Sequence, residues 1–145
     1  MGIAERNLKY AVPYLEPGEE PRAAVVLQLK GGTGLFAFGA LGVLLSGLFN
    51  KKRRAAAEAA GLPIGGYGNN VVVTDRRILV LNGKKLVAAA PAGTIRHAEI
   101  TGGKVNAALA LHMANGDTVE AVASKVLKPD AWVAAVNELA GRASG

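Results

Sequence analysis

The chain has 145 residues, 50% of them hydrophobic and 19% charged, and this composition suits one compact domain with a core of ordinary size. It contains no cysteine, which excludes a disulfide framework and a thiolate metal site. The net charge of +6 lies entirely in residues 51–145 and favours anionic partners, either lipid headgroups or nucleic acid phosphates.

The first 22 residues are predicted to be a polar lead that contains several prolines. The stretch MGIAERNLKY is too polar for a secretory signal, so we expect a cytoplasmic protein. In the following run, VPYLEPGEEP, Pro13, Pro17 and Gly18 disfavour regular structure and indicate a linker. We therefore expect the lead at 1–22, a single domain at 23–141 and a short tail at 142–145.

A glycine-rich apolar insert, at 31–69 within the domain, is predicted after a first strand at Ala24–Lys30. In the insert, Gly32, Gly34 and Ala37 match G-x-G-x-x-A, the weaker form of the dinucleotide-binding fingerprint. That fingerprint needs a second parallel strand with an acidic residue about twenty residues later. The sequence there is NKKRRAAAEAAG, which is alanine-rich and favours a helix. The context therefore argues against a nucleotide site.

The same insert is long enough to enter a membrane. Residues 31–50 contain no charge, and a spanning helix needs about twenty apolar residues. The cations KKRR at 51–54 are typical of the cytoplasmic side of such a helix. A single crossing, however, would separate the strand at 24–30 from all later strands. The insert therefore either dips into the bilayer and returns, lies on a surface, or follows N-terminal residues that sit outside the domain.

A helical wheel separates the small and the bulky side chains of the insert. Gly39, Gly42 and Ser46 form a stripe of small residues, which allows helices to approach closely. The stripe predicts helix pairing between subunits or in lipid, or packing of the insert on its own domain. The bulky face consists of Phe38, Leu41, Leu45 and Leu48.

From Val71 onward the sequence predicts six short strands and one terminal helix. The strands are VVVT, RILVL, KLVAAA, TIRHAEI, NAALALHM and TVEAVA. Asn82-Gly83 and Asn115-Gly116 predict type I′ hairpin turns, whose central residues have positive φ. The helix PDAWVAAVNELAG is expected to end at Gly141. Its inward-facing residues are predicted to be Trp132, Val136 and Leu139.

Short motifs within these strands point to a known family. They are Thr74, Arg76 and Arg77 in VTDRR, Ile95, and Gly116 with Asp117 in ANGD. Together with the strand spacing, they resemble the bacterial pleckstrin-homology-like domains, which are related to GRAM domains. The likeness covers residues 70–141 well and 17–30 loosely, and the long apolar insert departs from it. The resemblance implies a mainly β fold, a bent seven-stranded antiparallel barrel capped by a C-terminal α-helix.

The sequence indicates a protein that is not an enzyme and that holds no cofactor and no metal. His97 and His112 are fifteen residues apart, without an H-x-x-x-H or H-E-x-x-H spacing. Nothing resembles a nucleophile elbow or a pair of catalytic carboxylates. We interpret Asp75, Arg76 and Arg77 as a structural corner, in which Asp75 caps backbone donors and one arginine pairs with it.

Two classes of function remain. The first is a binding module at the inner face of an anionic membrane, because the resemblance implies that the loop between the first two strands meets lipid headgroups. The second is a homo-oligomeric assembly, or a complex with another protein chain, formed through the insert. Nucleic acid is not expected, because aromatic stacking platforms are missing. The predicted contact residues are Lys30, Phe36, Phe38, Leu41, Leu45, Leu48, Phe49, Lys51, Lys52, Arg53 and Arg54.

Overall fold

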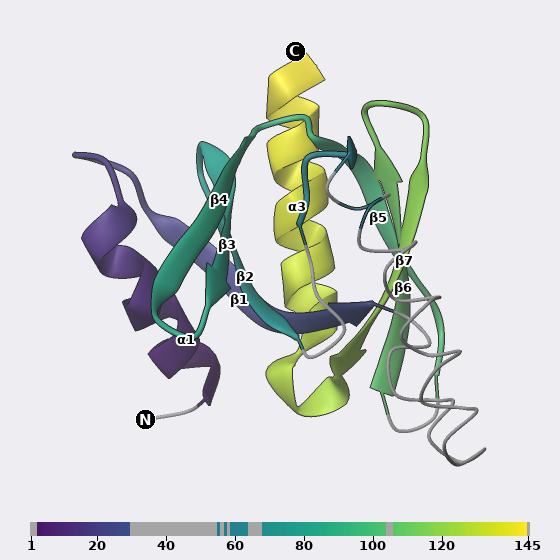
Figure 1. The fold of residues 1–145 in the computed structure, drawn as a ribbon, viewed down its shortest axis with the longest axis horizontal. Helices are drawn as coiled ribbons and strands as arrows, with labels where there is room; N and C mark the ends of the chain where they lie inside the picture. The colour runs from purple at the N-terminus through teal and green to yellow at the C-terminus, as the bar shows by residue number, and fades with distance from the viewer. Residues whose placement is uncertain are drawn as a thin grey trace.

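The computed structural model describes residues 3–29, 55, 57, 59–63, 68–103 and 106–144 (Figure 1). An N-terminal helix and a 3-10 turn precede seven strands, and a second 3-10 turn leads into the terminal helix. The elements are α1 (Ile3–Ala11), η1 (Val12–Tyr14), β1 (Pro21–Leu29), β2 (Asn69–Thr74), β3 (Arg77–Asn82), β4 (Lys85–Pro91), β5 (Ile95–Gly102), β6 (Asn106–Met113), β7 (Thr118–Ser124), η3 (Lys125–Leu127) and α3 (Pro129–Ser144). Within these described ranges, no helix has both the length and the apolar character needed to cross a membrane.

The seven strands form one antiparallel sheet in the order β4-β3-β2-β1-β7-β6-β5. The predicted mainly β fold with one C-terminal helix is confirmed. The sheet is not closed, however, because β4 and β5 are its two edges and do not pair. Asn137 of α3 gives a physical reason, since its amide accepts a hydrogen bond from the Ala98 N–H (2.8 Å) and donates one to the Ala98 C=O (2.9 Å). The helix thus takes backbone groups of β5 that a closing strand would need.

The terminal helix supplies the centre of the main core, as the sequence predicted. Trp132, Val136 and Leu139 are all buried, and the indole N–H of Trp132 donates to the Val71 C=O at 3.1 Å. The predicted stop at Gly141 is wrong, because α3 continues to Ser144. Gly141 does not have the positive φ that ends many helices, and it remains a helical residue.

The N-terminal residues fold onto the sheet, and the interpretation of the run 12–21 as a linker is wrong, because Tyr14 and Leu15 pack against the sheet and Glu19 is buried. Helix α1 covers the outer face of β1, β2 and β3, opposite the face that α3 covers (Figure 1). A second apolar cluster lies beneath it, made of Ala11, Ala24, Val72, Leu79 and Leu81. The unbroken apolar runs in β2 and β3 are the sequence signal for this second cover. Strands with such runs are buried on both faces of the sheet, so each face must be covered by another element.

Part of the predicted insert belongs to the main core. Ala57, Ala60 and Leu62 are buried in the same cluster as Trp132. Residues 55, 57 and 59 are helical, as the alanine-rich sequence predicted, and the Leu62 N–H donates to the Ala57 C=O at 2.9 Å. The end of the insert is therefore anchored inside the fold.

The two predicted hairpin turns are present with different geometry. Asn82 pairs with Lys85, so Gly83 and Lys84 are the central residues, and only Gly83 has positive φ (+61°). This is the pattern of a type II′ turn, which has glycine at the first central position. The second turn is longer, because Met113 N–H donates to the Asp117 C=O across it.

Candidate functional site: the basic end

All eleven predicted contact residues lie in 30–54, outside the described residues, so their roles remain predictions. The structure does show where the connection that contains them leaves the sheet and where it returns. It leaves the sheet after Leu29 at the end of β1 and returns at Gly68 before β2. Leu27 and Asn69 are direct partners in these antiparallel strands. Both ends of the connection 30–67 therefore lie at one end of the sheet.

The turn between β3 and β4 lies at this same end, because β1 to β4 alternate in direction. It carries Lys84 and Lys85, both exposed. The Tyr14 hydroxyl donates to the Lys84 C=O at 2.9 Å, and the Lys84 ammonium lies 5.6 Å from the centre of the Tyr10 ring. The N-terminal residues thus hold the turn in place, while both lysines stay exposed to solvent.

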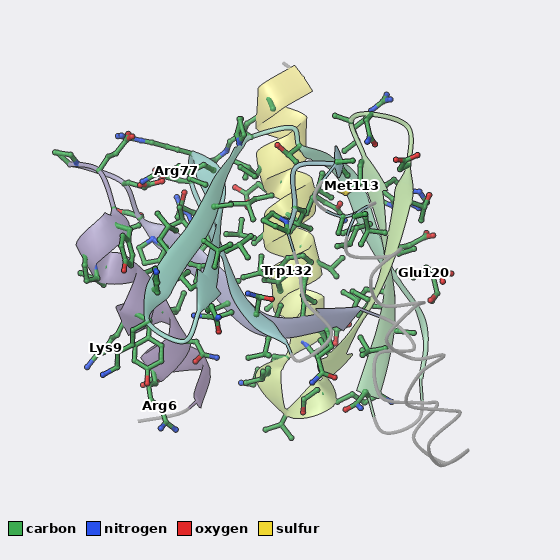
Figure 2. All side chains as sticks on the ribbon, viewed as in Figure 1. Arg6, Lys9, Arg77, Met113, Glu120 and Trp132 are labelled. Atoms are coloured by element: carbon green, nitrogen blue, oxygen red, sulfur yellow. The ribbon has the colours of Figure 1, made fainter. Side chains whose placement is uncertain are left out.

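Helix α1 adds two more cations to this end. The Asn70 amide donates to the Asn7 C=O at 2.9 Å, which fixes α1 over the start of β2. Arg6 and Lys9 are exposed on the side of α1 that points away from the sheet (Figure 2). We call the four cations Arg6, Lys9, Lys84 and Lys85 the basic end. None of them forms an ion pair with another described residue, and Glu5 is the single acidic residue of α1.

The opposite end of the sheet has arginines that are already paired. It holds the β2–β3 corner, the start of β1 and the last turns of α3. The pairs there are Arg22 with Glu20 (3.7 Å), Arg76 with Glu16 (3.7 Å), Arg77 with Glu19 (2.9 Å) and Arg142 with Glu138 (2.7 Å). Only the basic end therefore presents several cations without an internal counter-charge among the described residues.

The corner at the opposite end is structural, but its contacts differ from those predicted. The Thr74 hydroxyl, rather than Asp75, accepts the N–H groups of Arg76 (3.1 Å) and Arg77 (3.0 Å). The Asp75 carboxylate instead accepts the Glu20 N–H at 3.0 Å. The arginines pair with acidic residues of the N-terminal segment, so the prediction that one of them pairs with Asp75 is wrong.

Glu19 is the centre of this corner and its side chain is fully buried. Burial by itself raises the pKa of Glu19, but the Arg77 guanidinium, the Glu16 N–H and the Thr74 hydroxyl bind its carboxylate and together lower the pKa from 4.5 to about 2. The bond to Glu19 also raises the pKa of Arg77. The pair fastens the N-terminal segment to the sheet.

The two histidines are neighbours in space. They are cross-strand partners in β5 and β6, and their rings stack with centroids 5.8 Å apart. Glu99 lies between them, 3.2 Å from His112 Nε2 and 4.0 Å from His97 Nε2. All three side chains are exposed to solvent. Across the described part of the chain, no group of three or more histidine or acidic residues has a geometry that could hold a metal ion.

Comparisons with known proteins add little beyond the fold. No family model and no curated protein matches the chain. One similar solved structure is the crystal structure of the linker-DH/PH domains of p115-RhoGEF, at 18% identity and a TM-score of 0.41. The match covers 52% of this chain and 25% of that one. The fold itself, a seven-stranded antiparallel sheet with a terminal helix, therefore defines the class of protein.

Proposed function

We propose that this protein is a non-enzymatic binding module that attaches to an anionic membrane surface through the connection 30–67 and the basic end. The observation that carries the proposal is the contrast between the two ends of the sheet. Four cations at one end are unpaired, whereas four arginines at the other end are paired with glutamates. An end with several exposed, uncompensated cations attracts a negatively charged surface.

The distribution of charge along the sequence supports the same end of the sheet as the membrane contact. The connection 30–67 contains five cations, Lys30 and the run 51–54, and one anion, Glu58, which gives 5 − 1 = +4 of the total charge of +6. Each cation near an anionic leaflet contributes about 1 kcal/mol to binding. Each buried Leu or Phe side chain contributes about 1.5 to 3 kcal/mol. The apolar residues at 31–50 and the following cations are thus suited to the interior and to the headgroups of a bilayer, respectively.

A further apolar residue lies at this end of the molecule. Val126 in η3 is 77% exposed, between Lys125 and Lys128 in the sequence. Figure 1 shows η3 and the start of α3 at the lower end of the view, where the β3–β4 turn and α1 also lie. An exposed valine flanked by lysines fits a surface that is apolar inside and anionic at its boundary.

Sedimentation with vesicles tests the proposal. Wild type should bind vesicles that contain an anionic lipid and should not bind neutral vesicles. Changing the four cations 51–54 to Gln should weaken binding by up to about 4 kcal/mol at low salt, and Lys84→Gln with Lys85→Gln by up to about 2 kcal/mol. Raising the ionic strength should have the same effect as these changes.

The matched control removes two charges from the opposite end. Arg22→Gln with Arg142→Gln changes the net charge as much as the Lys84 and Lys85 pair does, and should leave vesicle binding nearly unchanged. An equal loss of vesicle binding in the two double variants would show that only net charge matters. That result would contradict a defined contact at the basic end. Indifference of wild type to anionic vesicles, together with self-association in size-exclusion chromatography, would instead favour the assembly of several copies through the insert.

A further inference from the structure

A cavity of about 640 Å³ lies where the last turns of α3 meet the β4–β5 turn and the start of β5. Figure 1 shows this turn passing beside the C-terminal half of α3, at the end of the sheet opposite the basic end. The lining residues are Ala92, Gly93, Thr94, Arg96, Ala114, Ala140 and Ala143. Sites for small organic molecules measure about 300 to 1,000 Å³, so the cavity has the size of such a site.

The walls of the cavity are small, apolar and held in place by backbone bonds. Apart from Thr94 and Arg96, every lining residue is alanine or glycine. The Thr94 N–H donates to the Pro91 C=O (3.2 Å), and the Thr94 C=O accepts the Ala114 N–H (2.9 Å). A Cβ added at Gly93 would lie 3.4 Å from that of Ala143, so the turn and the helix approach closely at one side. The turn therefore presents a fixed apolar surface to a ligand.

Arg96 is the single charged residue that lines the cavity. It is exposed, and its side chain forms no ion pair and no hydrogen bond with another described residue. The register shifts between Ile95 and His97, which leaves Arg96 without a partner in β6. The four arginines named above at this end of the sheet are paired with glutamates, whereas no acidic residue lines this cavity. The Arg96 guanidinium is thus available to an anion from outside.

The charge and the size of the cavity define the class of ligand. One guanidinium balances one negative charge, and its planar fork matches a carboxylate. A phosphate dianion would keep a second charge near the last turn of α3, which carries partial negative charge. A bare carboxylate would leave most of the 640 Å³ and the alanine methyl groups unused. The ligand that fits is therefore a monoanion with an apolar body.

We propose that this cavity binds a small organic carboxylate, whose carboxylate group pairs with Arg96 and whose apolar body packs on the alanines of the turn and of α3. The inference does not rest on the proposed membrane function, because the cavity and the basic end lie at opposite ends of the sheet. It gives the protein a second ligand, at the end that the proposed membrane contact leaves free.

Titration of the full chain with 2-naphthoate, followed by ¹H–¹⁵N NMR, tests the proposal. The amide signals of Gly93, Thr94, Ala114 and Ala140 report on the cavity itself. Wild type should bind one 2-naphthoate with saturable shifts of these signals. Acetate lacks the apolar body and 2-naphthamide lacks the charge, so each should bind at least about tenfold more weakly.

Two variants separate the contribution of the charge from that of the apolar wall. Arg96→Gln should weaken 2-naphthoate binding about tenfold and leave 2-naphthamide binding unchanged. Its control is Arg142→Gln, which removes the same charge from a paired arginine at this end of the sheet. Ala140→Leu should fill the cavity and abolish binding of both compounds. Its control is Ala134→Leu, the same change at an exposed position of α3 outside the cavity.

Three results would overturn the carboxylate site. The first is the absence of saturable shifts around the cavity in wild type. The second is an equal loss in Arg96→Gln and Arg142→Gln, which would show a response to net charge alone. The third is wild-type affinity in Ala140→Leu. Vesicle binding by Arg96→Gln should stay close to that of wild type, and a large loss would contradict the independence of the two sites.

Discussion

Replacing Glu19 with Gln tests how the N-terminal segment is fastened to the sheet. The variant keeps the size of the side chain and removes the charge that binds Arg77. The lowering of the pKa from 4.5 to about 2 corresponds to about 3 kcal/mol of stability from the ionised carboxylate. Glu19→Gln should therefore lower the free energy of unfolding by about this amount at pH 7, because it leaves a largely buried guanidinium without its counter-charge.

The pH dependence of the free energy of unfolding measures the stabilisation by ionised Glu19 in a second, independent way. Because the folded pKa of Glu19 is lowered, the unfolded chain takes up the proton more readily than the folded protein does. The stabilisation is therefore complete above a pH of about 4.5 and is lost as the pH falls toward 2. Urea unfolding followed by Trp132 fluorescence at several pH values from 7 to 2 should show this loss in wild type, and a smaller one in Glu19→Gln.

The control for this experiment is Glu138→Gln, which breaks an ion pair whose two side chains are both more than half exposed. Exposed pairs contribute about 0 to 1 kcal/mol, so this variant should unfold almost as wild type does. The reasoning is refuted if Glu19→Gln also costs less than about 1 kcal/mol, or if wild type and Glu19→Gln lose stability in parallel between pH 5 and pH 2.

Three further predictions concern the core, the sheet edge and the insert. Trp132→Ala should cost about 3 to 5 kcal/mol in urea unfolding, and a loss below about 1 kcal/mol would contradict the burial of the ring. Asn137→Ala should cost about 1 to 3 kcal/mol and increase aggregation, since it leaves the Ala98 backbone at a sheet edge unpaired; light scattering equal to that of wild type would argue against this protective role. Deletion of residues 34–50 should leave a folded, more soluble monomer by circular dichroism and size-exclusion chromatography, because it keeps the buried residues Ala57, Ala60 and Leu62; unfolding would mean that the deleted residues belong to the core.

The strands and the terminal helix could be predicted because their signals are local. Apolar runs bounded by turn residues define each strand, and the spacing of Trp132, Val136 and Leu139 defines the buried face of α3. Helix α1 was not predicted, because residues 1–10 were interpreted only as a polar lead. A proline disfavours helical conformation at its own position in a helix interior and at the residue before it. Because α1 ends at Ala11, two residues before Pro13, neither restriction applies to it.

The contacts that build the surface could not be predicted, because they join distant parts of the chain. Glu19 and Arg77 are 58 positions apart, and no local pattern selects Arg77 over Asp75 or Arg76 as the partner. His97 and His112 become neighbours only in the register that β5 and β6 adopt, which shifts between Ile95 and His97. The basic end likewise depends on α1, which brings Arg6 and Lys9 to the end of the sheet that carries Lys84.

The placement of the chain's own elements narrows where a partner can bind. The inner face of the sheet is covered by α3 together with Ala57, Ala60 and Leu62, and the outer face of β1 to β3 is covered by α1. At the edges, Asn137 occupies backbone groups of β5, and Pro91 at the end of β4 lacks the N–H that an added strand would need. The inner face of the sheet, the outer face of β1 to β3 and part of each edge are thus already used. Four of the described cations lie without an ion pair at the end from which 30–67 emerges, so a partner that binds there can do so without displacing any described strand or helix.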